Sequence, residues 1–233
     1  MLDKTNLDSV KSVAMSFLYL DVKVDKKIPF VVSHPYFTTT VAHAFDNERK
    51  PLMLDITRDD DLKKARDAVK RDIDRVDNYL RFLHMIRPPY LPAFFKYTEK
   101  FLSKEDFSHF LRSMWTLVEY PNADPTVSND EFLRYFLQAD EEDLMDEDDY
   151  KYYLDLPDEL TVYRGVKPKG KVLALSWTLS EKKADWFANR FQPDGSVYQA
   201  KIEKQYVLAY FNCRSEQEVV LDYRRLFDIK VVK

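Results

Sequence analysis

Two acidic residues near the C-terminus, Glu216 and Glu218, have a spacing that suits a site for positive charge. They lie in residues 215–221, Ser-Glu-Gln-Glu-Val-Val-Leu, where alternating and then aliphatic residues predict a β-strand. Side chains at i and i+2 of a strand share a face, so the two carboxylates are expected to point the same way, with Cα atoms about 6.5–7 Å apart. Such a pair lies either on a solvated edge of a sheet or in a site that uses negative charge.

Two more strands are predicted shortly before this pair. Residues 160–166 form the first, with Arg164 near its end and Gly165 allowing the chain to bend away. Residues 171–178 form the second, whose alternation puts Ser176 and Thr178 on one face. Leu173, Leu175 and Trp177 lie on the other face, which favours packing of Trp177 in a core.

A helix is predicted to follow these strands. Ser180 is suited to be its N-cap. Four apolar residues follow at i, i+3, i+4 and i+7 and would form one stripe packed on the sheet: Ala184, Phe187, Ala188 and Phe191.

The order Arg164, Ser176-Trp177-Thr178, Glu216-Gln217-Glu218 resembles the Arg, Ser-Thr-Ser, Glu-x-Glu signature of mono-ADP-ribosyltransferases. That family includes arginine-modifying bacterial toxins and phage-encoded transferases. The sequences around these residues, 162–165 and 184–188, are similar to its compact bacterial and phage members. The resemblance covers residues 156–233. It departs from the family in the Ser-Trp-Thr motif and in a gap of only 12 positions between Arg164 and Ser176.

The resemblance implies a reaction in which the nicotinamide–ribose bond of NAD breaks and ADP-ribose passes to an acceptor. Glu218 would bond a ribose hydroxyl and stabilise an oxocarbenium-like transition state. Glu216 would orient or deprotonate the acceptor, and a Glu at this position goes with arginine acceptors. Arg164 would bind the diphosphate of NAD, and Ser176 would hold Glu218 by a hydrogen bond.

The remaining candidate NAD-binding residues are Gly165, Trp177 and Thr178, beside Arg164 and Ser176. For Trp177, a stacking platform for nicotinamide is the alternative to core packing. Protein arginine is the preferred acceptor. A nucleic acid acceptor, simple hydrolysis of NAD, and an inactive module that binds a partner are the alternatives. The resemblance suggests a toxin or phage effector that acts in the cytoplasm of its own cell or of a target cell.

Composition excludes several other classes of site. The chain of 233 residues has only three glycines, which rules out a Gly-x-Gly-x-x-Gly fingerprint and a phosphate-binding P-loop. Its four histidines lack the spacing of metal ligands, so no metal is expected. A single cysteine, Cys213, rules out an internal disulfide and fits a reducing compartment. No run of 18 apolar residues is present, so neither a membrane span nor a membrane partner is expected, and no signal peptide is evident.

The charge is uneven along the chain. Residues 156–233 contain 14 Lys or Arg and 10 Asp or Glu, against 36 and 40 in the whole chain, so the remainder is strongly acidic. The basic region suits an anionic dinucleotide. The acids concentrate in residues 139–150, which are predicted to be a solvated linker or helix face at the boundary before the catalytic core. Binding of a basic partner, or shielding of the site before activation, is the alternative.

Residues 1–155 are predicted to be mainly helical and either to recognise the substrate or to pack on the sheet. A helix is expected over 59–84, and Ser103 and Ser128 are expected to cap two later helices. Short strands are expected within 28–40 and 52–56. The predicted fold is therefore α+β, with a helical region 1–155 followed by a catalytic core 156–233 that the resemblance makes a split β-sandwich.

Overall fold

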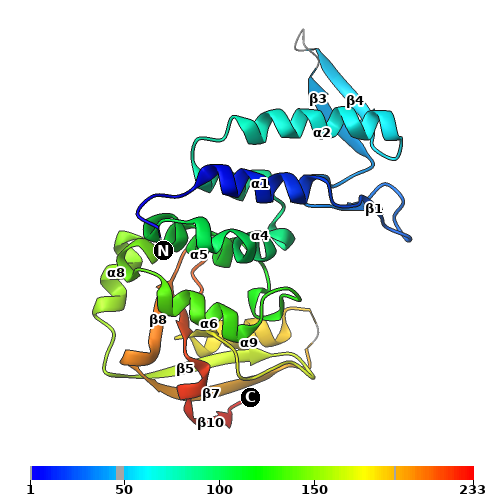
Figure 1. The fold of residues 1–233 in the computed structure, drawn as a ribbon. Coiled ribbons are helices and arrows are strands. Elements are labelled where there is room, and N and C mark those ends of the chain that lie inside the picture. Colours follow the sequence, from blue (N-terminus) through cyan, green and yellow to red (C-terminus); the bar gives the residue numbers. More distant parts are fainter. Residues whose placement is uncertain (1, 46–49, 192) are drawn as a thin grey trace. The chain divides into compact units, whose positions relative to one another are not determined.

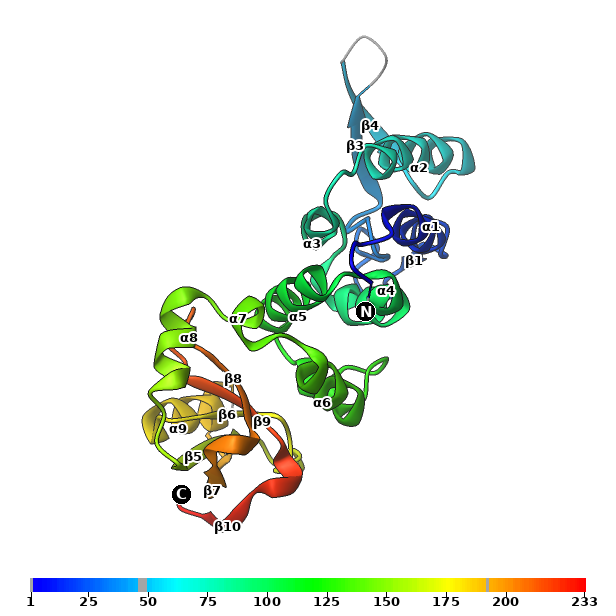
Figure 2. The same ribbon diagram turned by 60° about the vertical axis from the view of Figure 1, so that its left-hand side comes forward.

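The computed structural model describes residues 2–45, 50–191 and 193–233, and it has the mixed helices and sheets of the α+β class predicted from the sequence (Figures 1 and 2). Its contacts divide the chain into two compact units, Met1–Val118 and Glu119–Lys233. Across the described ranges, no helix combines the length and the apolar composition that a membrane span requires.

The first unit combines helices with two short hairpins. Its helices are α1 (Leu7–Leu18), α2 (Asp59–Asp74), α3 (Phe82–Met85), α4 (Leu91–Thr98) and α5 (Lys104–Leu117). Single 3-10 turns lie at η1 (Tyr79–Arg81), η2 (Pro88–Tyr90) and η3 (Glu99–Phe101). The hairpins pair β1 (Lys23–Val24) with β2 (Val32–Ser33), and β3 (Val41–Phe45) with β4 (Pro51–Asp55).

Aromatic rings fill the core of this first unit. Tyr79 lies with its ring centroid 4.6 Å from that of Phe110, and its hydroxyl is 2.8 Å from that of Thr98. Phe94 and Phe95 of α4 are fully buried in the same cluster. The hydrogen bond to Thr98 satisfies the one polar group that Tyr79 takes into this apolar interior.

The predicted helix over 59–84 is too long. Helix α2 ends at Asp74, and the buried residues that follow are Val76, Tyr79 and Phe82. Val76 lies between α2 and η1, Tyr79 lies in η1 and Phe82 begins the short helix α3, so separate short elements replace the continuous α-helix. The Ser103 cap is confirmed, because its side chain accepts a hydrogen bond from the Asp106 amide at 3.2 Å.

Six strands of the second unit form one antiparallel sheet in the order β10-β7-β5-β6-β9-β8. They are β5 (Glu159–Val166), β6 (Ser176–Thr178), β7 (Ser196–Glu203), β8 (Val207–Phe211), β9 (Glu218–Leu221) and β10 (Phe227–Val231). Strand β5 pairs with β7 over its whole length. The predicted strand over 160–166 is confirmed, whereas β6 covers only the last three residues of the predicted strand over 171–178.

Helix α9 (Glu181–Asn189) packs on strands β5 and β7. Its predicted cap is confirmed, because the Ser180 side chain accepts from the Lys183 amide at 3.2 Å. Ala184 and Ala188 are buried as predicted, but Phe191 lies beyond the end of the helix and is 62% exposed.

Gly165 lies where α9 crosses β5. A Cβ on this residue would be 2.0 Å from the Ala184 carbonyl oxygen and 2.5 Å from the Ala188 nitrogen. The strand continues through Gly165 to Val166, so the predicted bend at this glycine is wrong. The glycine allows the helix backbone to approach the strand, as glycine does at close crossings.

The acidic segment is helical and belongs to the second unit. It contains α7 (Glu141–Leu144) and α8 (Glu147–Leu154), which follow α6 (Asn129–Gln138), and all three helices contact β8. The capping box of Ser128 with Glu131 is confirmed at the start of α6. The contacts thus divide the chain well before the predicted boundary at residue 155.

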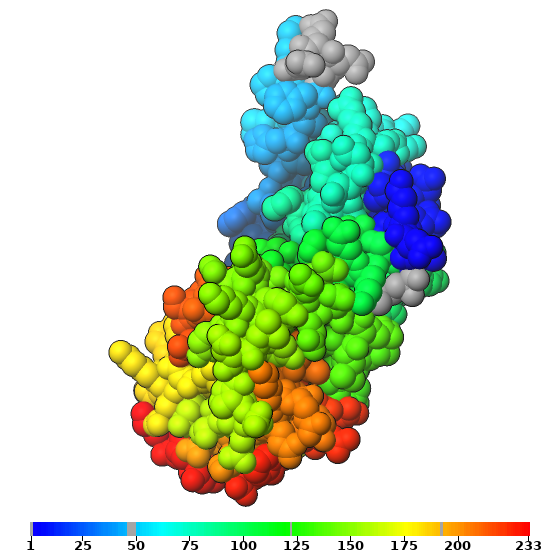
Figure 3. All heavy atoms as spheres, turned by 90° about the vertical axis from the view of Figure 1, so that its left-hand side faces the viewer, coloured from blue at the N-terminus to red at the C-terminus, as the bar shows by residue number. Residues whose placement is uncertain are grey.

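Apolar side chains explain why this acidic segment packs instead of forming a linker. Leu144 and Met145 are buried. The Tyr153 hydroxyl donates to the Val207 carbonyl at 3.1 Å, and the Tyr152 ring stacks on that of Tyr210 at 4.3 Å. In the space-filling view, the yellow-green atoms of this part of the chain lie against the orange atoms of the strands (Figure 3). The carboxylates of Glu141, Glu142, Glu147 and Asp148 are exposed, whereas that of Asp149 is buried, and the aromatic and aliphatic side chains contact β8.

Three turns complete the second unit, at η4 (Pro121–Ala123), η5 (Lys204–Tyr206) and η6 (Tyr223–Arg225). In η6, Asp222 caps the turn and holds Arg224 by two hydrogen bonds, from Nε at 2.8 Å and from Nη2 at 2.9 Å.

Candidate functional site

Three neighbouring strands bring the predicted site residues together. Strand β6 lies between β5 and β9, with Thr178 paired to Tyr163 on one side and to Glu218 on the other. Residues directly opposite each other in antiparallel strands share a face. Tyr163, Thr178 and Glu218 therefore form a row across three strands, although 40 positions of sequence separate the last two.

Arg164 follows Tyr163 along β5, and its side chain reaches the neighbouring strand. Its Nη1 donates a short hydrogen bond to the Ser176 carbonyl, and Nε donates to the Lys171 carbonyl at 3.5 Å. Burial lowers the pKa of the Arg164 guanidinium to about 10, while the negative charge of Glu218 acts in the opposite direction. The group therefore remains a cation at neutral pH, and it lies within electrostatic reach of Glu218.

Glu218 opens strand β9 and is only 8% exposed. The predicted strand over 215–221 is wrong before this residue, because Ser215 and Gln217 have φ of 53° and 47°. A residue in the left-handed region interrupts the alternation of a strand. Glu216 and Glu218 are thus a loop residue and a strand residue, not an i, i+2 pair on one strand.

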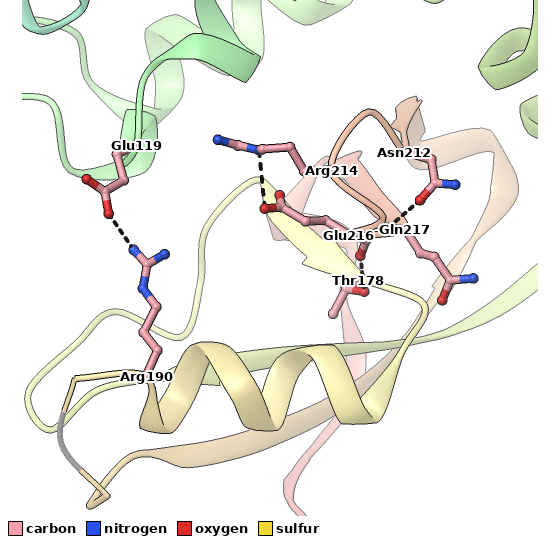
Figure 4. Close-up of polar contacts among 7 residues, drawn as sticks. All are labelled: Glu119, Thr178, Arg190, Asn212, Arg214, Glu216 and Gln217. Atoms are coloured by element: carbon pink, nitrogen blue, oxygen red, sulfur yellow. Dashed lines mark hydrogen bonds and ion pairs between the residues drawn. The ribbon is translucent and has the colours of Figure 1, made fainter.

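The loop that carries Glu216 is held by hydrogen bonds from β6 and from within the loop (Figure 4). The Thr178 hydroxyl donates to the Glu216 carbonyl at 2.6 Å, and the Leu179 amide donates to the Gln217 carbonyl at 3.0 Å. The Gln217 amide donates to Oδ1 of Asn212 at 3.2 Å. These bonds hold the backbone in two left-handed conformations that are unfavourable for residues other than glycine.

The Glu216 side chain makes an ion pair inside the same loop. Its Oε1 lies 3.2 Å from Nε of Arg214, and Figure 4 shows the two side chains pointing toward each other. The Glu216 side chain is 18% exposed, and that of Arg214 is 48% exposed. A partly exposed carboxylate therefore lies two residues from the buried Glu218 and already binds a guanidinium.

The other predicted site residues have different places. Ser176 pairs with Val220, so the position opposite Glu218 belongs to Thr178, and the contact of Ser176 with Arg164 is through its backbone carbonyl. Trp177 is 2% exposed and its Nε1 donates to the Ala174 carbonyl at 2.9 Å. Core packing of Trp177 is thus confirmed, and the ring leaves no open face for nicotinamide. Gly165 contacts α9, as described above.

Thr178 holds the acidic loop in place, a role that the sequence pattern did not indicate. Its hydroxyl donates to the Glu216 carbonyl and accepts from the Ser180 amide at 3.1 Å, so it joins the start of α9 to the acidic loop.

The substitution Thr178→Val keeps the shape of the side chain and removes both hydrogen bonds. We expect it to lower the free energy of unfolding by about 1–3 kcal/mol and to speed amide exchange in residues 215–218, because buried partners lose their hydrogen bonds. Thermal unfolding and hydrogen-exchange mass spectrometry measure these effects.

The exposed Thr161 of β5 offers the matched control for this substitution. Thr161→Val makes the same chemical change on the same sheet, and we expect its stability to stay within about 0.5 kcal/mol of the unmodified protein. Equal effects at Thr161 and Thr178 would show that the Thr178 hydroxyl does not hold the loop.

The guanidinium of Arg190, at the end of α9, is surrounded by aromatic rings, and no sequence pattern predicted this arrangement. Nη2 of Arg190 lies 2.9 Å from Oε1 of Glu119 (Figure 4), and its guanidinium carbon is 4.7 Å from the ring centroid of Phe191. The rings of Tyr120 and Trp186 lie at 5.1 and 5.4 Å. These cation–π contacts and the ion pair fix the first residues of this unit to the end of its helix.

No His, Cys, Asp and Glu residues within 2–45, 50–191 and 193–233 form a group of three or more that could hold a metal ion. The arrangement instead offers a cation on β5 and a buried carboxylate on β9, the two strands that flank β6, beside a more exposed carboxylate on a loop. It can bind an anionic group at Arg164 and stabilise positive charge at Glu218.

No protein-family model matches this sequence, and neither a curated protein nor a solved structure shows a significant match to the chain.

Proposed function

We propose that the unit Glu119–Lys233, whose described strands form one six-stranded sheet, is an NAD-dependent mono-ADP-ribosyltransferase. The observation that carries the proposal is the position of the three motif segments on three adjacent strands, with Arg164 within electrostatic reach of the buried Glu218. Surface residues without a shared role would not be expected to come together from β5, β6 and β9 in this way. The preferred acceptor is an arginine side chain of another protein.

Arg164 binds the diphosphate of NAD in this proposal. Among the residues that the structure describes, the carbonyls of Lys171 and Ser176 accept hydrogen bonds from two of its five N–H groups and fix the plane of the guanidinium. The others are left to donate to phosphate oxygens, in the forked geometry that suits them. Its pKa of about 10 keeps the charge that a diphosphate needs.

Glu218 stabilises the reacting ribose. As the bond from C1′ to the nicotinamide nitrogen breaks, its electron pair leaves with the ring, which departs neutral, and positive charge develops on the ribose. A carboxylate buried to 8% exposure acts on that charge through little water, so its effect is larger than on the surface.

Glu216 selects and activates the acceptor. It is more exposed than Glu218 and already binds a guanidinium in cis, which is the group that an arginine acceptor would present. We expect Glu216→Gln to lower transfer to protein arginine by about 10²-fold, while NAD hydrolysis falls by much less, because the amide cannot take the proton. Transfer and hydrolysis are measured in one reaction, as labelled protein and free ADP-ribose. An equal loss of both would assign Glu216 to NAD binding instead.

The proposed function is tested by nicotinamide release from NAD by the purified protein, with separate pools of protein and RNA added. Labelling of protein arginine supports the proposal, and labelling of RNA would change the acceptor class. Free ADP-ribose as the sole product would make the protein an NAD glycohydrolase. Absence of both NAD binding and nicotinamide release would overturn the proposal in favour of a module that binds a partner.

A further inference from the structure

The ion pair between Arg214 and Glu216 reproduces, inside the chain, the contact that an arginine acceptor would make. We propose that Arg214 is an intramolecular acceptor, so that the protein transfers ADP-ribose to its own Arg214. This inference rests on the proposed function and names a substrate of the same site. It is motivated by the 3.2 Å separation of Nε of Arg214 from Oε1 of Glu216 (Figure 4).

The loop fixes the carboxylate and leaves the guanidinium room to move. Glu216 and Gln217 are held at their backbone by Thr178 and Leu179 of the neighbouring strand and its exit. The Arg214 side chain is 48% exposed, against 18% for that of Glu216. A short shift of the exposed side chain therefore brings another nitrogen of the same guanidinium forward without breaking the loop.

Backbone conformation favours this encounter. Ser215 between the two residues has φ of 53°, and the Ser215 amide donates to the Asn212 carbonyl at 2.9 Å. This turn brings the side chains at 214 and 216 to one side of the loop. The Asn212 amide in turn donates to Oδ2 of Asp149 in α8 at 3.3 Å, which ties the start of the loop to the acidic helix.

The transfer step balances with the groups present. The C1′–nitrogen bond of NAD breaks and its electron pair leaves with nicotinamide. A terminal nitrogen of Arg214 forms the new bond to C1′, and the proton that it loses passes to the Glu216 carboxylate. The products are ADP-ribosylated Arg214, nicotinamide and a proton, and no further reactant is needed.

Modification would end the activity of the molecule that carries it. An ADP-ribosyl group on Arg214 remains attached beside Glu216 and covers the position that an external arginine must reach. We therefore expect transfer to an external protein to slow as Arg214 becomes modified, and to stay linear for longer in Arg214→Lys, which keeps the charge but not the guanidinium.

Arg224 provides the matched internal control. Its Nε lies 2.8 Å from Oδ1 of Asp222 and its side chain is 54% exposed, so it is an arginine of similar exposure in a similar ion pair. Its carboxylate is not part of the candidate site. Non-specific glycation by free ADP-ribose would modify both arginines alike, whereas transfer at the site modifies Arg214 alone.

The experiment is peptide mapping by mass spectrometry of the full chain after incubation with NAD, with nicotinamide release measured in parallel. We expect occupancy at Arg214 to exceed that at Arg224 by at least about tenfold, because the intramolecular acceptor is held in place. The rate of modification should be unchanged when the protein is diluted tenfold, as a reaction within one molecule requires. In Arg214→Lys the adduct should disappear, while nicotinamide release continues once an external arginine acceptor is supplied.

Three outcomes would overturn the inference. Release of nicotinamide without modification of Arg214 would reject Arg214 as an acceptor and leave the proposed function standing. A rate that falls with dilution would make the reaction intermolecular. No release of nicotinamide from the unmodified protein would reject the inference together with the proposed function.

Discussion

Glu218→Gln is expected to lower kcat for nicotinamide release by at least about 10²–10³-fold, the usual cost of losing a preorganised electrostatic contact with a transition state. The side chain keeps its size, so the change removes negative charge and little else. KM for NAD should change much less, because Glu218 acts on charge that develops only as the bond breaks. The measurement is steady-state nicotinamide release over a range of NAD concentrations.

A charge control separates this effect from a general change in electrostatics. Glu159 lies on β5 of the same sheet, where its exposed carboxylate is 2.6 Å from Nζ of Lys201. Glu159→Gln removes the same charge and should leave kcat unchanged, since exposed ion pairs contribute little. Wild-type release by a folded Glu218→Gln variant would remove Glu218 from the chemistry.

Gly165→Ala is expected to produce the largest loss of stability. The added Cβ would overlap the backbone of α9 at Ala184 and Ala188, at 2.0 and 2.5 Å, and neither backbone can move without displacing the helix. Overpacking of this kind costs about 3 kcal/mol, equivalent to a fall of roughly 10 °C in the melting temperature of this unit. Differential scanning calorimetry measures the loss.

The same substitution at Gly170 gives the comparison. A Cβ at Gly170 would lie 2.9 Å from the Lys167 carbonyl oxygen and from Cγ1 of Val166, in an exposed turn that can shift. Its cost should therefore be clearly smaller. If Gly165→Ala melts with the unmodified protein, α9 does not lie as close to β5 as described.

Local hydrogen bonds made parts of this fold predictable from the sequence. The caps at Ser103, Ser128 and Ser180 each require only a side chain and an amide three residues later, so the sequence contains the whole interaction. Strand β5 was predictable because Leu160 and Val162 alternate with exposed residues and because threonine, valine and tyrosine favour strands. The α+β class followed from these elements together.

The errors arise where tertiary contacts override a local pattern. The sequence 215–221 alternates like a strand, yet hydrogen bonds that Asn212 accepts and Thr178 donates hold Ser215 and Gln217 in conformations that a strand excludes. The end of α2 at Asp74 depends on which aromatic residues reach the core of its unit, which a helical periodicity does not reveal.

The residues of the candidate site were predictable, but their mutual positions were not. Arg164, Glu216 and Glu218 were identified from type and order alone. The assignment of Thr178, and not Ser176, to the position opposite Glu218 depends on strand register, which needs the paired strands and not one of them. The pairing of Arg190 with Glu119 joins residues 71 positions apart and left no mark in the sequence.

The packing of the acidic helices has a consequence for how the chain can be divided. Asp149 binds the backbone at Asn212, Met145 accepts from the Tyr210 amide at 3.3 Å, and Tyr153 binds Val207. A fragment that starts at residue 156 would retain every motif residue yet lose the layer on which β8 and the Glu216 loop are built. The smallest part of the chain that keeps the site intact is therefore defined by the buried Met145 and Tyr153 and not by the signature residues, and it begins before the acidic segment.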